Sequence, residues 1–138
     1  MSSQGTPNSG LAELAHRCFV LGDALSLVAY TNPLDSLGAN TVAADLVEPP
    51  LANGYAAIIL DPTGWTILGG LSTYVHAAPN NINGNPAWSA TGSWGADPVN
   101  GFALVYGTAC IGFRDRQTPW VAAAGRKIEQ RIMELLGA

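Results

Sequence analysis

The chain has 138 residues, of which 48% are apolar and only 12% are charged, against about 25% charged in an average soluble protein. The formal net charge is −4, and no lysine or arginine occurs between Cys18 and Phe113. Neutralising phosphates requires those cations, so the composition argues against nucleic acid and anionic membranes as partners. No apolar run reaches the length of about 18 residues that a membrane span needs. The length predicts a single domain.

The first residues divide into an arm and a helix. Residues 1–9 are small and polar without periodicity, which predicts an extended arm. They also lack the basic and apolar stretches of a secretory signal. Residues 10–21 carry apolar side chains at helical spacing, and Gly22 can end a helix there. We therefore expect an N-terminal helix that opens a domain spanning residues 10–117.

A series of short apolar runs follows, separated by Gly, Pro and Asn. The last two runs flank Gly107 and Thr108, which predicts a hairpin. No helical pattern separates the runs, so antiparallel pairing is expected. The predicted fold is mainly β, an antiparallel β-sandwich or partly open barrel. The predicted strands are residues 25–30, 55–60, 65–68, 71–77, 87–94, 102–106 and 109–113.

One long connection interrupts this pattern at residues 32–53. Prolines divide it, and only residues 42–46 suggest a helical turn. Pro49 and Pro50 exclude pairing inside a sheet. A connection of this length in a small domain usually has a function or forms an interaction arm.

Residues 118–138 predict a long amphipathic C-terminal helix, with Thr118 as its cap and Pro119 in its first turn. Its apolar stripe contains Val121, Ala124, Ile128, Ile132 and Leu135, and the last three of these serve with Trp120 as anchors. We expect those anchors to pack within the subunit or between subunits. The basic side chains would face an acidic neighbour, which would order subunits head to tail. The anchors are Trp120, Ile128, Ile132 and Leu135, and the basic residues are Arg126, Lys127 and Arg131.

Catalytic and metal-binding patterns are missing from the sequence. His16 and His76 are the only histidines, and no nucleophile elbow or phosphate-binding loop occurs. We expect no enzyme activity, cofactor or metal, although Asp61 and Asp97 carry oxygens that calcium could use. Cys18 and Cys110 are expected to be two buried thiols or one disulfide. The four tryptophans are expected in the core, or alternatively in a sugar-binding groove. They are Trp65, Trp88, Trp94 and Trp120.

The order of several short motifs resembles a known group of proteins. Those motifs are LSLVAYTN at residues 25–32, NGYA at 53–56, DPTGW at 61–65, WSATG at 88–92 and GFALVYG at 101–107. Together they resemble small β-sandwich virion proteins of tailed bacteriophages. The final Y-G-Y of that group is here spread over Gly101–Phe102 and Tyr106–Gly107, and the predicted C-terminal helix is not typical of it.

The resemblance implies a virion structural protein that decorates or cements the capsid. A tail, neck or baseplate component is the alternative. The implied partners are the major capsid protein, or tail and neck subunits, together with further copies of the chain in a homo-oligomer. The implied location is the virion, assembled in the cytoplasm of a bacterial host. A carbohydrate-binding module or adhesin is a second alternative, because it could use Trp88 and Trp94 on the same fold.

Overall fold

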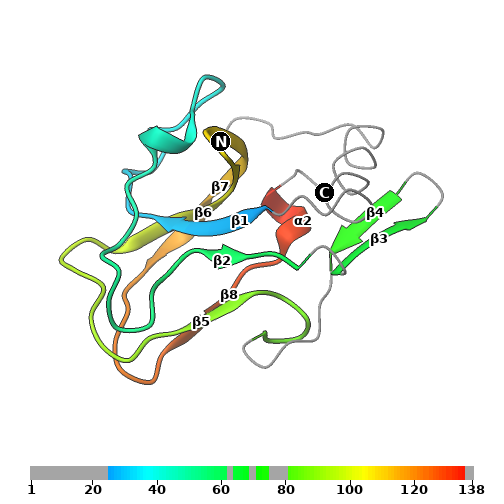
Figure 1. Cartoon of the computed structure of the whole chain (residues 1–138). Coiled ribbons are helices and arrows are strands. Elements are labelled where there is room, and N and C mark those ends of the chain that lie inside the picture. Colours follow the sequence, from blue (N-terminus) through cyan, green and yellow to red (C-terminus); the bar gives the residue numbers. More distant parts are fainter. Residues whose placement is uncertain (1–24, 62–63, 69–70, 75–80, 136–138) are drawn as a thin grey trace.

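The computed structural model describes residues 25–61, 64–68, 71–74 and 81–135. Within them the protein is mainly β, with three antiparallel sheets and little helix (Figure 1). The predicted arm, the predicted N-terminal helix, Cys18, His16 and His76 lie outside the described residues. The elements are β1 (Ser26–Tyr30), η1 (Ala43–Asp45), β2 (Ile58–Ile59), β3 (Trp65–Leu68), β4 (Leu71–Tyr74), β5 (Ala87–Ser89), β6 (Val99–Tyr106), β7 (Ala109–Trp120), β8 (Lys127–Glu129) and α2 (Ile132–Leu135).

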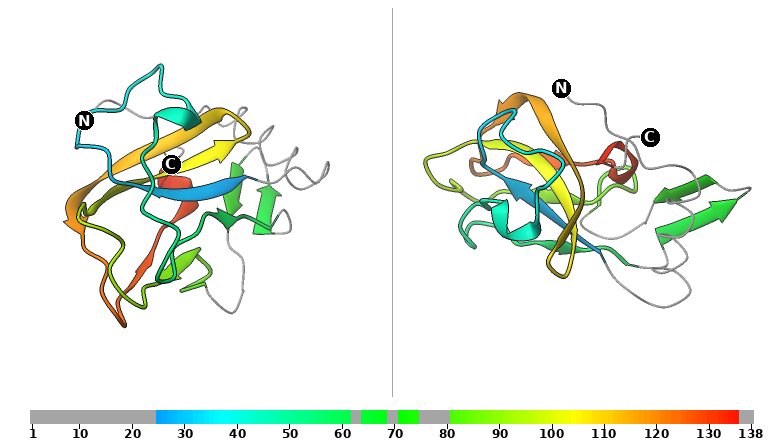
Figure 2. Two further views of the ribbon diagram at one scale, coloured as in Figure 1. Left: turned by 60° about the vertical axis from the view of Figure 1, so that its left-hand side comes forward. Right: turned by 90° about the horizontal axis from the view of Figure 1, so that it is seen from above.

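The largest sheet has four strands in the order β2-β1-β6-β7. β6 and β7 form the predicted hairpin, which turns at Gly107, and Gly107 adopts a φ of 59°. β3 and β4 make a separate two-stranded ribbon, set apart from the main sheet in each view (Figures 1 and 2). β5 pairs with β8, so the chain's C-terminal part returns to the middle of the sequence.

β1 is apolar from Leu27 to Tyr30, and both of its faces are covered. Leu27 and Ala29 are fully buried in one hydrophobic cluster, whereas Val28 and Tyr30 belong to a second cluster. Successive side chains of a strand point to opposite faces, so the two clusters lie on the two sides of the main sheet. We call the side of Leu27 the aromatic face. The side of Tyr30 is called the excursion face, because the long connection after β1 packs against it through Leu37 and Leu46.

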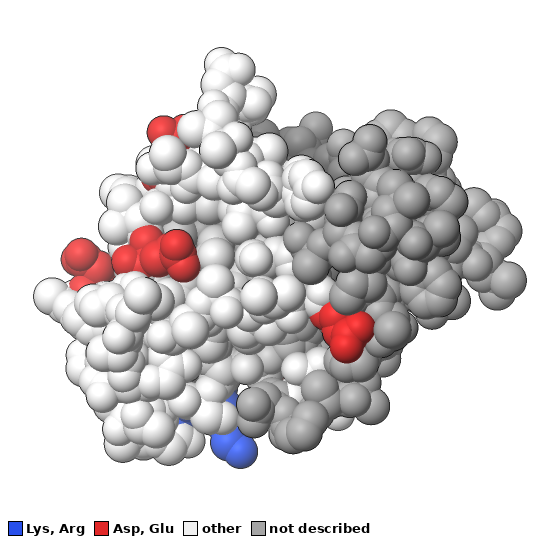
Figure 3. Space-filling model, viewed as in Figure 1, with Lys and Arg blue, Asp and Glu red and all other residues white. Residues whose placement is uncertain are grey.

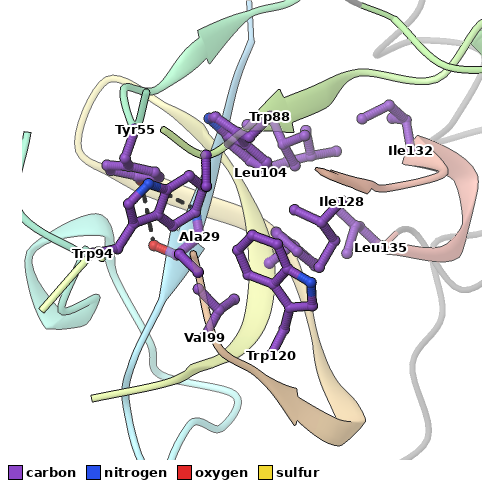
Figure 4. Packing of buried hydrophobic residues seen from close by; sticks show 14 of the residues in the cluster. Ala29, Tyr55, Trp88, Trp94, Val99, Leu104, Trp120, Ile128, Ile132 and Leu135 are labelled. Carbon is purple, nitrogen blue, oxygen red and sulfur yellow. Dashed lines mark hydrogen bonds between the residues drawn. The ribbon is translucent and has the colours of Figure 1, made fainter. Parts of the chain in front are cut away.

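The aromatic face carries the main core. Trp88 stacks on Phe102 with ring centroids 5.5 Å apart, and Trp94 meets Trp120 edge to face at 5.2 Å. Tyr55 joins the group at 5.8 Å from Trp88 and 5.0 Å from Trp94 (Figure 4). Rings in these offset and edge-on arrangements contribute beyond the area they bury. The core is thus assembled from segments far apart in the sequence.

The predicted long C-terminal helix over residues 118–138 is wrong. β7 continues through Thr118 and Pro119 to Trp120, residues 127–129 form β8, and the helix α2 has four residues. Gly125 adopts a φ of 84°, a left-handed conformation that cannot continue an α-helix. Val121, expected on the buried stripe, is 57% exposed. Residues 120–135 therefore fold as strand, turn, strand and one helical turn against the aromatic face.

Two predicted strands are shorter than expected, and one helical turn is confirmed. Of residues 55–60, only β2 pairs in the sheet, and of residues 87–94 only β5 does. The turn predicted at residues 42–46 is present as η1. Asn53, Gly54 and Gly95, which lie just outside these two segments, all have positive φ values.

Candidate interaction surface

Residues 32–53 are called the excursion below. Residues 32–47 lie against the excursion face, whereas Asn53 at the far end reaches Trp94 of the aromatic face, whose Nε1 donates to the Asn53 carbonyl at 2.9 Å. Leu37 and Leu46 pack on the cluster of Val28, Tyr30 and Ala103 on the excursion face. The side chain of Asn32 donates to the Asp45 carbonyl at 2.8 Å and accepts from the Val47 amide at 2.8 Å. The side-chain amide of Asn32 thus makes the two hydrogen bonds that a backbone N–H and C=O would make in a turn.

Asp115 of β7 fastens the start of the excursion. Its Oδ1 accepts a 2.6 Å hydrogen bond from the Tyr30 hydroxyl, and its Oδ2 accepts one from the Asp35 amide at 2.8 Å. Asp35 has a φ of 61°, which aspartate tolerates better than most residues. Burial raises the pKa of Tyr30 above its ordinary value, and the hydrogen bond to Asp115 adds to the rise. The phenol therefore stays protonated and keeps its donor role.

A second tyrosine–carboxylate pair fastens the other end. The Tyr55 hydroxyl donates to Glu48 at 2.5 Å, while the Ala29 amide donates to the same hydroxyl at 3.2 Å. Burial raises the pKa of Tyr55, and the hydrogen bond to Glu48 raises it further. Asp115 and Glu48 thus accept hydrogen bonds from phenolic hydroxyl groups instead of forming ion pairs with cations.

Because polar contacts hold the excursion, several of its apolar side chains point outward. Leu51 is 80% exposed, Val47 56%, Val42 47% and Leu34 43%. Asp35, Asp45 and Glu48 are exposed beside them. Among the described residues on the face drawn in Figure 3, most are uncharged, carboxylates lie at several places and cations lie only at the lower margin. Exposed apolar groups on a fixed scaffold are typical of an interaction surface.

The excursion also encloses an open hollow of about 520 Å³. Amide, hydroxyl and backbone groups line it, with Asp45 as its carboxylate. Asp45 accepts from the Val42 amide through Oδ2 at 2.9 Å. The hollow contains no cation, so its chemistry suits a donor or a positive group.

The four predicted anchors lie in the core of the subunit itself. Ile132 is fully buried and Leu135 is 1% exposed, and Ile128 and Trp120 are 6% and 7% exposed (Figure 4). They lie in one cluster, but on three elements instead of one long helix: Trp120 ends β7, Ile128 lies in β8, and Ile132 and Leu135 lie in α2. Their role is to attach residues 121–135, called the C-terminal layer below, to the aromatic face.

The three predicted basic residues lie on the outside of that layer. Arg126, Lys127 and Arg131 are all exposed. Arg126 donates to the Val121 carbonyl at 2.7 Å and stacks over the Trp120 ring at 5.3 Å. Lys127 and Arg131 form no ion pair with any residue that the structure describes. These two cations are therefore available to a partner.

A groove of about 410 Å³ lies between β7 and α2. Arg114 and Arg116 line it, and Arg114 approaches Glu134 at 3.7 Å. Desolvation lowers the pKa of Arg116, whose Nε donates to the Thr118 carbonyl at 3.0 Å. Gln130 is only 8% exposed, and within the described part of the chain its Oε1 accepts no hydrogen bond. The groove is thus lined by the N–H donors of two arginines and by a buried acceptor, the Gln130 Oε1, whose hydrogen-bonding capacity is unused among the described residues.

Trp88 and Trp94 do not form a sugar platform. Trp88 and Trp94 are each 3% exposed, and their indole nitrogens donate to the carbonyls of Ala56 at 2.7 Å and Asn53 at 2.9 Å. Since both rings are covered and both N–H groups are satisfied, neither can stack on a sugar without unfolding the core. The prediction of a core role is confirmed for these two residues and for Trp120.

Other chemistry is sparse in the described residues. They contain no group of three His, Cys, Asp or Glu residues placed to hold a metal ion. No helix among them is long and apolar enough to cross a membrane. Cys110 is a free, partly buried thiol, and burial raises its pKa.

Comparison with known proteins gives no match. No family model, no curated protein and no solved structure matches the chain. The geometry of the two layers is therefore the basis for the function proposed below. Sequence reasoning identified the excursion but missed Asp115, Tyr30, Glu48 and Tyr55, whose only available signal was the absence of cations that could pair with those carboxylates.

Proposed function

We propose that this protein is a structural component of a bacteriophage virion, and that it decorates or cements the capsid through subunit contacts. The supporting observation is the excursion, a rigidly hydrogen-bonded surface that exposes four apolar side chains and lacks any cation. Charge-poor, apolar surfaces are typical of the centres of protein interfaces. In this proposal the main sheet and the β5–β8 ribbon are the two layers of a small β-sandwich.

Adhesion is the mechanism in this proposal. Burial of Leu51 and its exposed neighbours against a capsid subunit would release water from apolar area, at about 25 cal/mol per Å². The excursion loses little further freedom on binding, because Asn32, Asp115 and Glu48 already fix its course. Such preorganisation lowers the cost of association. No reacting group is required, and the protein is proposed to have no enzymatic activity.

Quantitative mass spectrometry of virions, purified on a density gradient from the host that carries the gene, tests this proposal. We expect the chain to be present in fixed ratio to the major capsid protein. A ratio of a few copies per particle would instead assign it to the tail, neck or baseplate. Absence from purified particles would refute a structural role in the virion.

A second experiment tests the surface. Recombinant chain should bind particles that lack it, and Leu51→Ser with Val47→Ser should weaken that binding while leaving the melting temperature nearly unchanged. The matched control is Thr91→Ser with Ala96→Ser, two exposed positions outside the excursion. Equal binding by both double variants would show that the excursion is not the adhesive surface.

A further inference from the structure

Side chains alternate between the two faces of a strand, and in β7 this places oppositely charged residues on opposite faces of the main sheet. In β7, Arg114 lies opposite Phe102 and therefore shares the aromatic face, where it meets Glu134. Asp115 lies opposite Gly101 and points to the excursion face, where it binds Tyr30. Neighbouring residues of opposite charge thus point to opposite sides of the sheet.

The same separation extends through the two outer layers. The excursion carries Asp35, Asp45 and Glu48, and no cation occurs in the sequence between Cys18 and Phe113. The C-terminal layer carries Arg126, Lys127 and Arg131 against Glu129 and Glu134. Residues 33–47 of the excursion and α2 lie apart in Figure 1 and in the right-hand view of Figure 2. Among the described residues, no carboxylate of the excursion forms an ion pair with a cation of the C-terminal layer.

We propose that the excursion of one copy docks on the C-terminal layer of a second copy, so that subunits associate head to tail. This inference rests on the proposed structural function, which it extends by naming a partner and an orientation. Lys127 and Arg131, which have no ion-pair partner among the described residues, would meet the carboxylates of the next subunit. Val121, 57% exposed on the C-terminal layer, adds an apolar contact for the excursion.

The two hollows support the same orientation. The excursion hollow offers Asp45 and neutral acceptors to a long basic side chain. The β7–α2 groove offers the Arg116 guanidinium to an incoming carboxylate or carbonyl, and the Oε1 of Gln130 to an incoming donor, beside the carboxylates of Asp115 and Glu134 that also line it. A contact between two different surfaces is heterologous, and repeated contacts of this kind close into a ring or extend as a filament.

A symmetric contact between two excursions is the principal alternative. It would bring Asp35, Asp45 and Glu48 of one copy against the same carboxylates of the other, with no cation on either side. Juxtaposed like charges oppose association. The head-to-tail contact places opposite charges together and is favoured for that reason.

Two variants of the full chain test the orientation in analytical ultracentrifugation. Lys127→Glu with Arg131→Glu reverses the net charge of the C-terminal layer, and Val47→Lys with Leu51→Lys places two cations on the excursion, opposite Lys127 and Arg131 in the proposed contact. All four side chains are exposed, so the fold should persist, which circular dichroism checks. Each variant alone should associate about 100-fold more weakly than the wild type, since the introduced charges then face like charges. An equimolar mixture should regain association, because both contacts become complementary again.

The control is Lys127→Arg with Arg131→Lys, which conserves both charges and should associate like the wild type. If the Lys127→Glu/Arg131→Glu variant associates as strongly as the wild type, the head-to-tail contact is refuted. If the wild type stays monomeric at all concentrations yet is present in purified virions, self-docking is refuted while the structural function stands. A wild type that is monomeric and absent from virions refutes both.

Discussion

Residues 32–47 of the excursion and the C-terminal layer cover opposite faces of one sheet and are attached to it by different forces. The excursion is fixed by hydrogen bonds that the side chains of Asn32, Asp115 and Glu48 make. Its residue Leu51 stays 80% exposed. The C-terminal layer is fixed by burying Trp120, Ile132 and Leu135, and it leaves its cations exposed. Attachment by polar contacts frees apolar groups for partners, whereas attachment by apolar contacts frees charged groups.

The two layers should therefore differ in how strongly side-chain substitutions lower the free energy of unfolding. Loss of a buried side chain removes transfer free energy and leaves a cavity, so the C-terminal layer should be sensitive to truncation. Exposed apolar residues contribute little to folding, so the outer surface of the excursion should tolerate substitution without loss of stability. The four predictions that follow test this contrast, from the largest expected effect to the smallest.

Trp120→Ala should reduce the free energy of unfolding by about 3–5 kcal/mol, because the ring is 7% exposed and packs against Trp94. Leu51→Ala, at an 80% exposed position, should change it by less than about 0.5 kcal/mol. Urea denaturation followed by tryptophan fluorescence and circular dichroism measures both. Similar losses for the two variants would contradict the division into a core-attached and an outward-facing layer.

Gly101→Ala should cost about 1–3 kcal/mol or more, because an added Cβ would lie 2.5 Å from the Arg114 carbonyl oxygen and closer still to the Tyr30 hydroxyl. The backbone of β7 cannot yield as a flexible side chain would, so Tyr30 must move and release Asp115. Gly38→Ala is the matched control, since nothing lies within 4 Å of its added Cβ. Thermal unfolding of both variants measures the difference, and a Gly101→Ala protein as stable as the control would disprove the close approach.

The sequence was sufficient to predict the mainly β fold, the β6–β7 hairpin and the position of the excursion, because these depend on local patterns. Continuous apolar runs and the Gly107 turn are local signals. The C-terminal helix failed because Ile128 and Ile132 are four residues apart, a spacing that fits both a helix and an alternating strand. Burial of Ile128, Gln130 and Ile132 alternates with exposure of Lys127 and Arg131, which is the strand pattern.

The tethers of the excursion could not be predicted, because each joins residues distant in sequence. Tyr30 and Asp115 are 85 positions apart, and their contact depends on β1 and β7 both flanking β6. The lack of cations showed only that the central carboxylates needed other partners. Local composition therefore indicated a function for this region, while strand order determined its geometry.

Alkaline pH should loosen the tyrosine tethers of the excursion. The pKa values of Tyr30 and Tyr55 are raised in the folded state by burial and by their carboxylate partners. Their stabilising effect is therefore complete below the unfolded pKa of about 10 and is lost as pH rises above it. The free energy of unfolding should fall by up to about 1.4 kcal/mol per pH unit for each tyrosine above that point. Urea titrations at increasing pH measure the slope.

Replacement of either tyrosine by Phe should reduce that slope. Tyr55→Phe should also lower stability at neutral pH, because the Ala29 amide loses an acceptor at a buried position. A slope that neither Tyr30→Phe nor Tyr55→Phe alters would assign alkaline unfolding to other groups.

Asn32→Asp should have the smallest effect and separates the two hydrogen bonds of that side chain. The aspartate can still accept from the Val47 amide, but it can no longer donate to the Asp45 carbonyl. We expect a loss of about 0.5–1.5 kcal/mol, the ordinary worth of one hydrogen bond. Hydrogen exchange should accelerate at Val47 and in η1 while the amides of β8 stay protected, because the C-terminal layer does not depend on this contact. Faster exchange in β8 as well would mean that the two layers unfold as one unit and that their attachment to the sheet is not independent.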